Sequence, residues 1–227
     1  MFMAVPSRYD LINLLITWGQ DDVWRMRAAR ECLTSHPERL LDLCCGTGKL
    51  AMKMARIAGN GTCIVGLDYS LPMLKLAITE AEHKHAGGRT SFVHGDTADL
   101  PFPDDHFDSA GIAFAFRNIT YKNPLTPRYL KEILRVLKPG GRFIIVESSQ
   151  PRAGLIRRLF HLYMRVFVFR LGYMLSGNRG AYHYLAESAS RFYTPDELRN
   201  LLLSSGFSHF STRPMMFGTI GLHVAVK

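Results

Sequence analysis

The sequence predicts an α/β protein, in which a doubly wound and mostly parallel sheet of about seven strands is covered by helices on both faces. Three observations support this. Short apolar runs alternate with amphipathic segments along most of the chain, which is typical of strands joined by crossover helices. A glycine-rich turn, Gly46-Thr47-Gly48, follows the first run. The last two runs have no helix between them, which favours an antiparallel hairpin at one edge of the sheet.

Length and composition fit one such domain, which we expect to span residues 1–227. Hydrophobic residues make up 47% of the 227 residues and charged residues 21%, a balance typical of folded globular proteins. Residues 1–10 lack a basic end followed by an apolar core, so we expect no secretory signal. The cysteines of this chain are either adjacent or isolated, and neither spacing forms a metal-binding motif. We therefore expect no metal site, and reduced thiols in a cytoplasmic protein. The cysteines are Cys32, Cys44, Cys45 and Cys63.

The elements follow one another in a regular order. Residues 1–36 are interpreted as a helical cap, with apolar positions at Leu11, Leu14, Leu15, Trp18 and Trp24. Parallel strands are expected at residues 39–43, 62–67, 90–94, 107–114 and 142–147. The closing hairpin is expected at residues 207–213 and 216–226, separated by Pro214.

Two helices have clear start and stop signals. Thr126-Pro127 is an N-cap followed by proline at the first helical position, and Pro139-Gly140-Gly141 is expected to end that helix. Thr194 and Glu197 form a capping box, and Gly206 is expected to end the second helix. Both helices present one apolar face, as helices packed on a sheet do.

Residues 151–192 are expected to form a basic helical insertion or lid. Six arginines and no acidic residue lie between positions 151 and 180, and the whole chain carries a formal charge of +9. Arg165 and Arg170 interrupt the apolar stretch too often for a membrane span. A basic amphipathic helix can instead lie on anionic lipid. A helix packed on the domain or in a homodimer contact remains an equal alternative, and no nucleic-acid partner is expected because no RNA-binding module is evident.

Polar residues at three neighbouring strand ends point to a nucleoside-containing ligand. Ligands of such sheets bind at the carboxyl ends of the strands, where Gly46 and Gly48 allow close backbone approach. Asp68 ends the second strand and suits a ribose diol, while Gly95-Asp96 follows the third and suits an adenine amino group. A phosphate-binding P-loop is excluded because Leu50 replaces the required Ser or Thr.

Several of these residues also have a plainer interpretation. Asp42 can hold the loop by accepting backbone N–H bonds, and Asp68 can cap the next helix. Met73 can be a core residue. Cys44 and Cys45 fit a tight loop better than a redox site, because no activating partner is visible.

The chain resembles the class I S-adenosylmethionine-dependent methyltransferases, and more closely the UbiE/MenG/Coq5 quinone C-methyltransferases. The glycine loop "LLDLCCGTGKL" and "EILRVLKPGG" are shared by many methyltransferases. Four stretches are more specific to the quinone family, and they are Arg8-Tyr9-Asp10, "GDTADLPFPDDHFD", "FAFRN" and "AYHYLAES". The resemblance covers the chain nearly end to end and implies a Rossmann-like fold with S-adenosylmethionine as cofactor.

The resemblance also implies roles for individual residues. Cofactor contacts are expected at Asp42, Cys44, Gly46, Thr47, Gly48, Asp68, Tyr69, Met73, Gly95, Asp96, Thr97 and Ala113. Ala113 stands where the family often has serine. Arg117 is the candidate group that stabilises a phenolate, Asn118 could orient a hydroxyl or a water, and Tyr9 or Asp10 could close the pocket, with Asp10 a possible base.

The implied reaction is methyl transfer to a ring carbon of a polyprenyl hydroquinone, with demethylmenaquinol favoured. Removing a proton from a ring hydroxyl of pKa near 10 makes the neighbouring carbon electron-rich. A methyltransferase acting on another small molecule or on RNA is the first alternative. A nicotinamide dehydrogenase or a lipid-surface binder is the alternative from another class.

Overall fold

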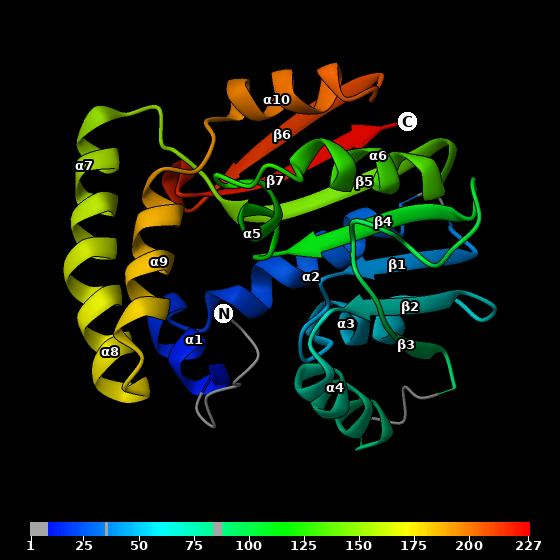
Figure 1. Cartoon of the computed structure of the whole chain (residues 1–227), viewed down its shortest axis with the longest axis horizontal. Helices are drawn as coiled ribbons and strands as arrows, with labels where there is room; N and C mark the ends of the chain where they lie inside the picture. Colours follow the sequence, from blue (N-terminus) through cyan, green and yellow to red (C-terminus); the bar gives the residue numbers. More distant parts are fainter. Residues whose placement is uncertain (1–8, 35, 84–87) are drawn as a thin grey trace.

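The computed structural model describes residues 9–34, 36–83 and 88–227. These residues form a seven-stranded sheet in the order β3-β2-β1-β4-β5-β7-β6 (Figure 1). Strands β1 to β5 are parallel, and β7 runs antiparallel to both β5 and β6. The predicted doubly wound sheet with an antiparallel edge hairpin is therefore confirmed. The strands are β1 (Arg39–Leu43), β2 (Cys63–Asp68), β3 (Thr90–His94), β4 (Phe107–Ala113), β5 (Leu137–Ser148), β6 (His209–Met215) and β7 (Ile220–Val226).

Both faces of the sheet are covered, because neighbouring residues of the central strands are apolar on both sides. In β5, Phe143 and Ile145 join one core cluster, whereas Ile144 and Val146 join the other. The first cluster is closed by α5 (Phe116–Thr120), α6 (Thr126–Val136) and α10 (Pro195–Ser204). The second is closed by α2 (Gln20–Cys32) and α3 (Lys49–Ile57). A further helix, α4 (Leu71–His83), packs on β2 and β3.

Several boundaries differ from the sequence prediction. The predicted N-cap at Thr126 is wrong, because α6 already includes Thr126 and its N-cap is Leu125. Strand β5 begins at Leu137, so Pro139-Gly140-Gly141 lies inside a strand and α6 ends earlier, at Val136. Pro214 lies within β6 and does not separate the two closing strands, which an edge strand tolerates because no ladder bond requires its missing N–H. The connection is a 3₁₀ turn at Met216–Gly218.

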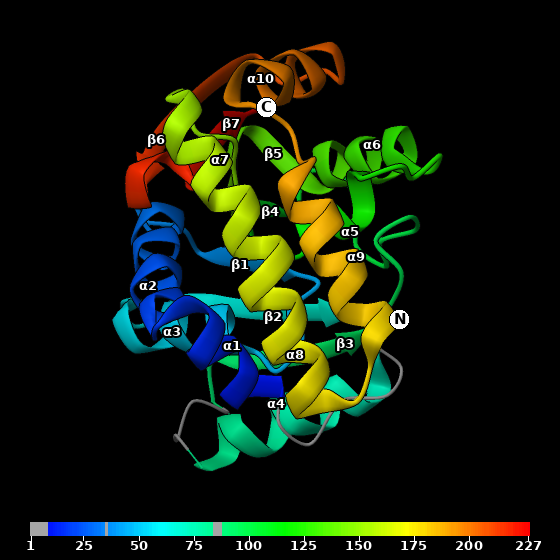
Figure 2. The same ribbon diagram turned by 90° about the vertical axis from the view of Figure 1, so that its left-hand side faces the viewer.

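A helical layer covers the carboxyl ends of the parallel strands. Helices α7 (Gly154–Tyr163), α8 (Phe169–Ser176) and α9 (Arg179–Ser190) lie in front of this edge, beside α1 (Tyr9–Thr17) (Figure 2). A five-residue π-helical segment, Met164–Val168, joins α7 to α8 with helical backbone angles on both sides. None of the helices that the structure describes is both long and apolar enough to cross a bilayer.

Candidate active site

A cavity of about 1020 Å³ opens between the carboxyl edge of the sheet and this helical layer. Its volume lies at the upper end of the range for ligand pockets, and it therefore has room for two molecules side by side. Most of the residues expected from the sequence line it: Cys44, Gly46, Thr47, Asp68, Tyr69, Met73, Asp96, Thr97, Ala113, Arg117 and Asn118. The structure thus brings together side chains from turns after four different strands.

Asp68 links the first two strand ends. Its Oδ2 accepts a hydrogen bond of 2.7 Å from the backbone N–H of Gly46, and its Oδ1 accepts one of 2.8 Å from Ser70. Gly46 has a φ of +56°, and a Cβ there would meet no atom within 4 Å, so the open space at the turn faces the cavity. Each carboxylate oxygen keeps a free lone pair for a ligand hydroxyl. Asp68 can therefore hold the backbone before α4 and bind a ligand at the same time.

Three expected contact residues do not line the cavity, namely Asp42, Gly48 and Gly95. Asp42 is buried and accepts the N–H of Ala51 at 2.9 Å, which secures the first turn of α3. Burial raises the pKa of Asp42 to about 7. A Cβ on Gly48 would approach Ala77 and Phe92 to 3.1 Å, so this glycine allows close packing behind the turn. Direct ligand contact by these three residues stays a prediction.

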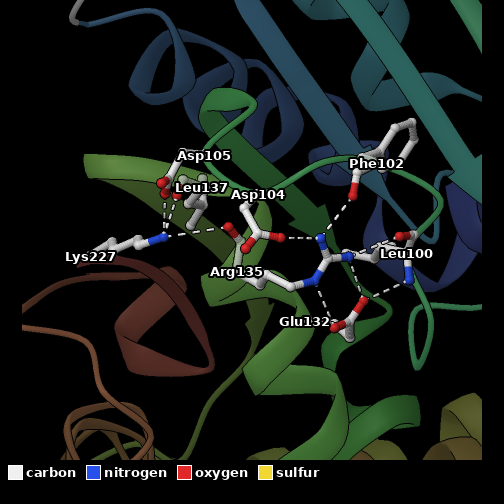
Figure 3. A network of polar contacts seen from close by, with 8 residues as sticks. All are labelled: Leu100, Phe102, Asp104, Asp105, Glu132, Arg135, Leu137 and Lys227. Atoms are coloured by element: carbon white, nitrogen blue, oxygen red, sulfur yellow. Dashed lines mark hydrogen bonds and ion pairs between the residues drawn. The ribbon is translucent and has the colours of Figure 1, made fainter.

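Asp96 lies on a loop that a polar network holds in place. Arg135 on α6 donates to the carbonyls of Leu100 and Phe102 and pairs with Glu132 and Asp104 (Figure 3). Glu132 in turn accepts the N–H of Leu100 at 2.9 Å. The carboxylate of Asp96 accepts the N–H of Ala98 at 2.9 Å and still lines the cavity.

The cysteines of the turn, Cys44 and Cys45, are half-buried free thiols. Burial raises the pKa of Cys44 to about 12 and that of Cys45 well above its ordinary value. The Sγ of Cys44 lies 3.5 Å from the hydroxyl oxygen of Thr97. Such thiols stay protonated at neutral pH, which favours the loop-packing interpretation over a nucleophile.

Arg117 forms a buried ion pair that the sequence did not predict. Its Nη1 donates to Oε1 of Glu147 at 2.6 Å, and its backbone N–H donates to Oε2 at 3.3 Å. The Glu147 side chain is fully buried and also accepts the N–H and the hydroxyl of Ser148. Four hydrogen bonds therefore compensate the buried carboxylate, as a buried charge requires.

Two polar atoms beside this pair have no partner among the described residues, Nε of Arg117 and Oδ1 of Asn118. Both residues line the cavity. A buried donor and a buried acceptor without partners are costly, and a polar ligand would satisfy both.

The sequence reasoning also missed Arg25, on α2. Its guanidinium carbon lies 5.0 Å from the ring centre of Phe114. Its Nε lies 3.7 Å from Oδ2 of Asp21, and this buried atom has no hydrogen-bond partner within the described part of the chain. The available signals were weak. Asp21 and Arg25 stand four residues apart beside Trp24, and Glu147 ends an otherwise apolar run.

The other half of the cavity is apolar. Helices α7 and α9 contribute Ile156, Phe160, Tyr182, Tyr184 and Leu185. At the mouth stand Trp18, Leu159 and Phe217, whose residues are 73%, 57% and 81% exposed. Tyr9 and Asp10 begin α1, but their side chains lie outside the described residues, so their predicted roles stay predictions.

Known proteins share this chain's sequence and fold. The model of the ubiE/COQ5 methyltransferase family matches residues 1–227. The demethylmenaquinone methyltransferase of Thermus thermophilus is 39% identical, over 99% of this chain and 98% of its own. The "Ubiquinone/menaquinone biosynthesis C-methyltransferase UbiE" of Pseudomonas fluorescens is 32% identical, over 100% of this chain and 87% of its own.

Solved structures agree on the fold. A SAM-dependent methyltransferase from Aquifex aeolicus has a TM-score of 0.63 at 16% identity, covering 96% of each chain. Human N-acetylserotonin methyltransferase in complex with SAM has a TM-score of 0.64 at 21% identity, covering 97% of this chain and 55% of that one. The match of the family model over the whole sequence, together with relatives of this identity, leads to one conclusion: the chain belongs to the ubiE/COQ5 methyltransferase family.

Proposed function

We propose that this protein transfers a methyl group from S-adenosylmethionine to a ring carbon of a polyprenyl hydroquinone, with demethylmenaquinol as the favoured acceptor. The supporting observation is the two-part cavity, which joins a polar edge at the strand ends to an apolar half that opens at an apolar mouth. The names of the relatives support the same acceptor class.

The residues present fit the cofactor. The Asp68 carboxylate would accept hydrogen bonds from a ribose, and the Asp96 carboxylate from an adenine amino group. The guanidinium of Arg25, whose Nε has no hydrogen-bond partner among the described residues, would bind the carboxylate of the methionine part. Bound S-adenosylmethionine supplies an electrophilic methyl group on a cationic sulfur.

The chain's own residues would activate the acceptor. Arg117, fixed by Glu147, offers its free Nε to a ring oxygen and stabilises the negative charge that appears when the hydroxyl loses its proton. The free Oδ1 of Asn118 accepts a hydrogen bond from that hydroxyl or from a water, which orients it. The apolar wall formed by α7 and α9 excludes bulk water, so these polar contacts act in a medium of low dielectric constant.

A membrane contact of the cytoplasmic protein belongs to the same proposal, because a polyprenyl quinol resides in a bilayer. Leu155, Leu159 and Leu162 form an exposed stripe at helical spacing on α7. Arg158 and Arg165 are exposed beside it, and no described acidic side chain lies within ion-pair distance of either. Apolar contacts combined with cationic side chains favour binding to anionic lipid. We expect no nucleic-acid partner, and a homodimer would require this stripe to be covered by a second copy.

The test uses labelled S-adenosylmethionine and chemically reduced demethylmenaquinone in mixed micelles. We expect label in the lipid fraction and a loss of about 10²–10³-fold in kcat for Arg117→Gln, as for removal of one charge-stabilising donor. Arg199→Gln, on the exposed side of α10, is the matched control and should keep full activity. No label in the lipid with the wild-type protein, or label only in RNA or in an amine, would refute the proposal.

The membrane part has a separate test. Flotation with vesicles of phosphatidylglycerol should recover the wild-type protein, whereas neutral phosphatidylcholine vesicles should recover much less. Leu155→Ser combined with Leu162→Ser should reduce recovery without lowering the unfolding midpoint, because both side chains are exposed. Equal flotation of the variant and the wild type would argue against this face.

A further inference from the structure

A second, smaller cavity of about 450 Å³ lies between α1 and α8. The two helices are side by side in both ribbon views and in contact (Figure 1, Figure 2). Among the described residues, no charged side chain lines this groove, and the lining consists of Leu14, Leu15, Trp18, Gly19, Phe167 and Leu171. Trp18 also lines the main cavity, so the groove begins where the mouth of the main cavity ends.

A row of stacked aromatic rings connects the two cavities. Tyr163, which lines the main cavity, stacks on Phe167 with ring centres 5.1 Å apart. Phe167 stacks on Trp18 at 6.4 Å and an interplanar angle of 16°. The Tyr163 hydroxyl donates to the carbonyl of Ile16 at 2.5 Å, which ties α7 to α1 beside the row. An apolar surface therefore continues from one cavity into the other.

The backbone holds Trp18 at this junction in an unusual conformation. Its φ is +54°, a left-handed value that costs free energy for a residue with a Cβ and that is often found at ligand sites. The conformation ends α1, since the backbone N–H of Gly19 donates to the carbonyl of Leu14 at 2.9 Å, and it leaves the residue Trp18 73% exposed. Phe167 is part of the π-helical segment, another local irregularity that is frequent at functional sites.

We propose that this groove binds the isoprenoid tail of the acceptor, which leaves the main cavity past Trp18 and lies between α1 and α8. The proposal rests on the proposed function, since it assigns a place to the part of the quinol that carries no reacting atom. A branched hydrocarbon needs no hydrogen-bonding partner, and the described side chains that line this groove are apolar apart from the indole N–H of Trp18. Its continuity with the ring site through Trp18 distinguishes it from an isolated apolar patch.

The kinetic test uses a substitution that fills the groove. Leu171→Trp adds bulk inside it, and Leu76→Trp makes the same change on an exposed position of α4 that lines neither cavity. For a quinol with a long tail, we expect KM of Leu171→Trp to rise about tenfold, which corresponds to roughly two methylene groups kept out of the groove. For the same ring without a tail, kcat/KM should stay within about twofold, and Leu76→Trp should match the wild type with both.

A binding test does not depend on methyl transfer. The chain has two tryptophans, so Trp24→Phe leaves Trp18 as the only one. Geranylgeraniol, an isoprenoid alcohol, should shift the Trp18 emission to the blue in a saturable way, because the ring becomes less exposed to water. In this background Leu171→Trp would add a second indole, so the blocking variant in this experiment is Leu171→Phe, which should weaken the response.

The outcomes separate this inference from the proposed function. A wild-type protein that methylates no quinol, with or without a tail, contradicts the function, whereas a saturable Trp18 shift in that same protein would still support the groove. Equal KM values for Leu171→Trp and wild type with the long-tailed quinol, together with no Trp18 shift, would overturn the groove. If oleate at the same concentration shifted the Trp18 emission equally, the assignment of the groove to isoprenoid chains would be overturned. The assignment would also be overturned if the protein formed a dimer in solution whose interface buries Trp18.

Discussion

Replacing Glu147 by Gln tests whether the buried ion pair both stabilises the fold and positions Arg117. The variant keeps a hydrogen-bond acceptor of the same shape but leaves the guanidinium without a counter-charge. Charge centres about 4 Å apart interact by about 4 kcal/mol at an effective dielectric constant of 20, and removing one partner of a buried pair typically costs about 3–5 kcal/mol. We therefore expect the free energy of unfolding to fall by about 3–5 kcal/mol, measured by urea denaturation at pH 7.

The same variant should lower kcat by about 10²-fold, because a displaced donor no longer meets the acceptor oxygen. Binding of S-adenosylmethionine, measured by calorimetry, should stay within about twofold. Glu31→Gln is the matched control, since Glu31 pairs with Arg142 in the middle of β5 and with Arg213 on β6. It should reduce stability modestly and leave kcat unchanged.

A double variant, Arg117→Met with Glu147→Gln, isolates the pair. It leaves no unpaired buried charge, so it should be more stable than Glu147→Gln alone, by on the order of 1–3 kcal/mol. Wild-type stability and wild-type kcat in Glu147→Gln would refute the reasoning.

Three further predictions concern other buried or cavity-lining groups. Asp68→Ala should weaken S-adenosylmethionine binding by about 100-fold in calorimetry, because charge-assisted hydrogen bonds contribute about 1.5–3 kcal/mol each; unchanged affinity would exclude the ribose contact. Burial raises the pKa of Asp42 from 3.8 to about 7, so the folded state loses stability as pH rises from about 4 to 7. In Asp42→Asn the midpoint of urea unfolding should change less over this pH range. Burial lowers the pKa of His223 from 6.5 to about 4, so stability is lost as pH falls from 6.5 to 4; His223→Gln should reduce that loss, and an unchanged acid slope would contradict the assignment.

Most of the fold could be predicted because the signal was local. Apolar runs between amphipathic segments predicted each of the seven strands, and the capping box at Thr194 is present as expected. Prediction failed where tertiary pairing decided the outcome. Pro139-Gly140-Gly141 is typical of a helix end, but pairing in the sheet extends β5 through it. Pro214 is compatible with β6 only because β6 is the edge strand.

The residues of the site also fall into those that local sequence signals predict and those that depend on tertiary packing. Asp68 and Asp96 could be predicted because they follow strands, and parallel strands place their ends at one edge. Arg117 came from the resemblance to a family, whereas its partner is 30 residues away in sequence, and no local pattern pairs them. The positions of Trp18 and Leu171 beside one groove depend on how α1 packs on α8, which the spacing of apolar residues does not specify.

The π-helical segment Met164–Val168 lets the long helix hold one extra residue while α8 keeps its rotation relative to α7. A π-bulge arises from one extra residue in an α-helix, and each residue of an α-helix turns the chain by about 100°. Without the wider turn, the extra residue would rotate α8 by that angle and carry Leu171 away from α1 while α7 keeps its place. This local irregularity therefore keeps the lining of the groove in register with the reacting groups of the main cavity.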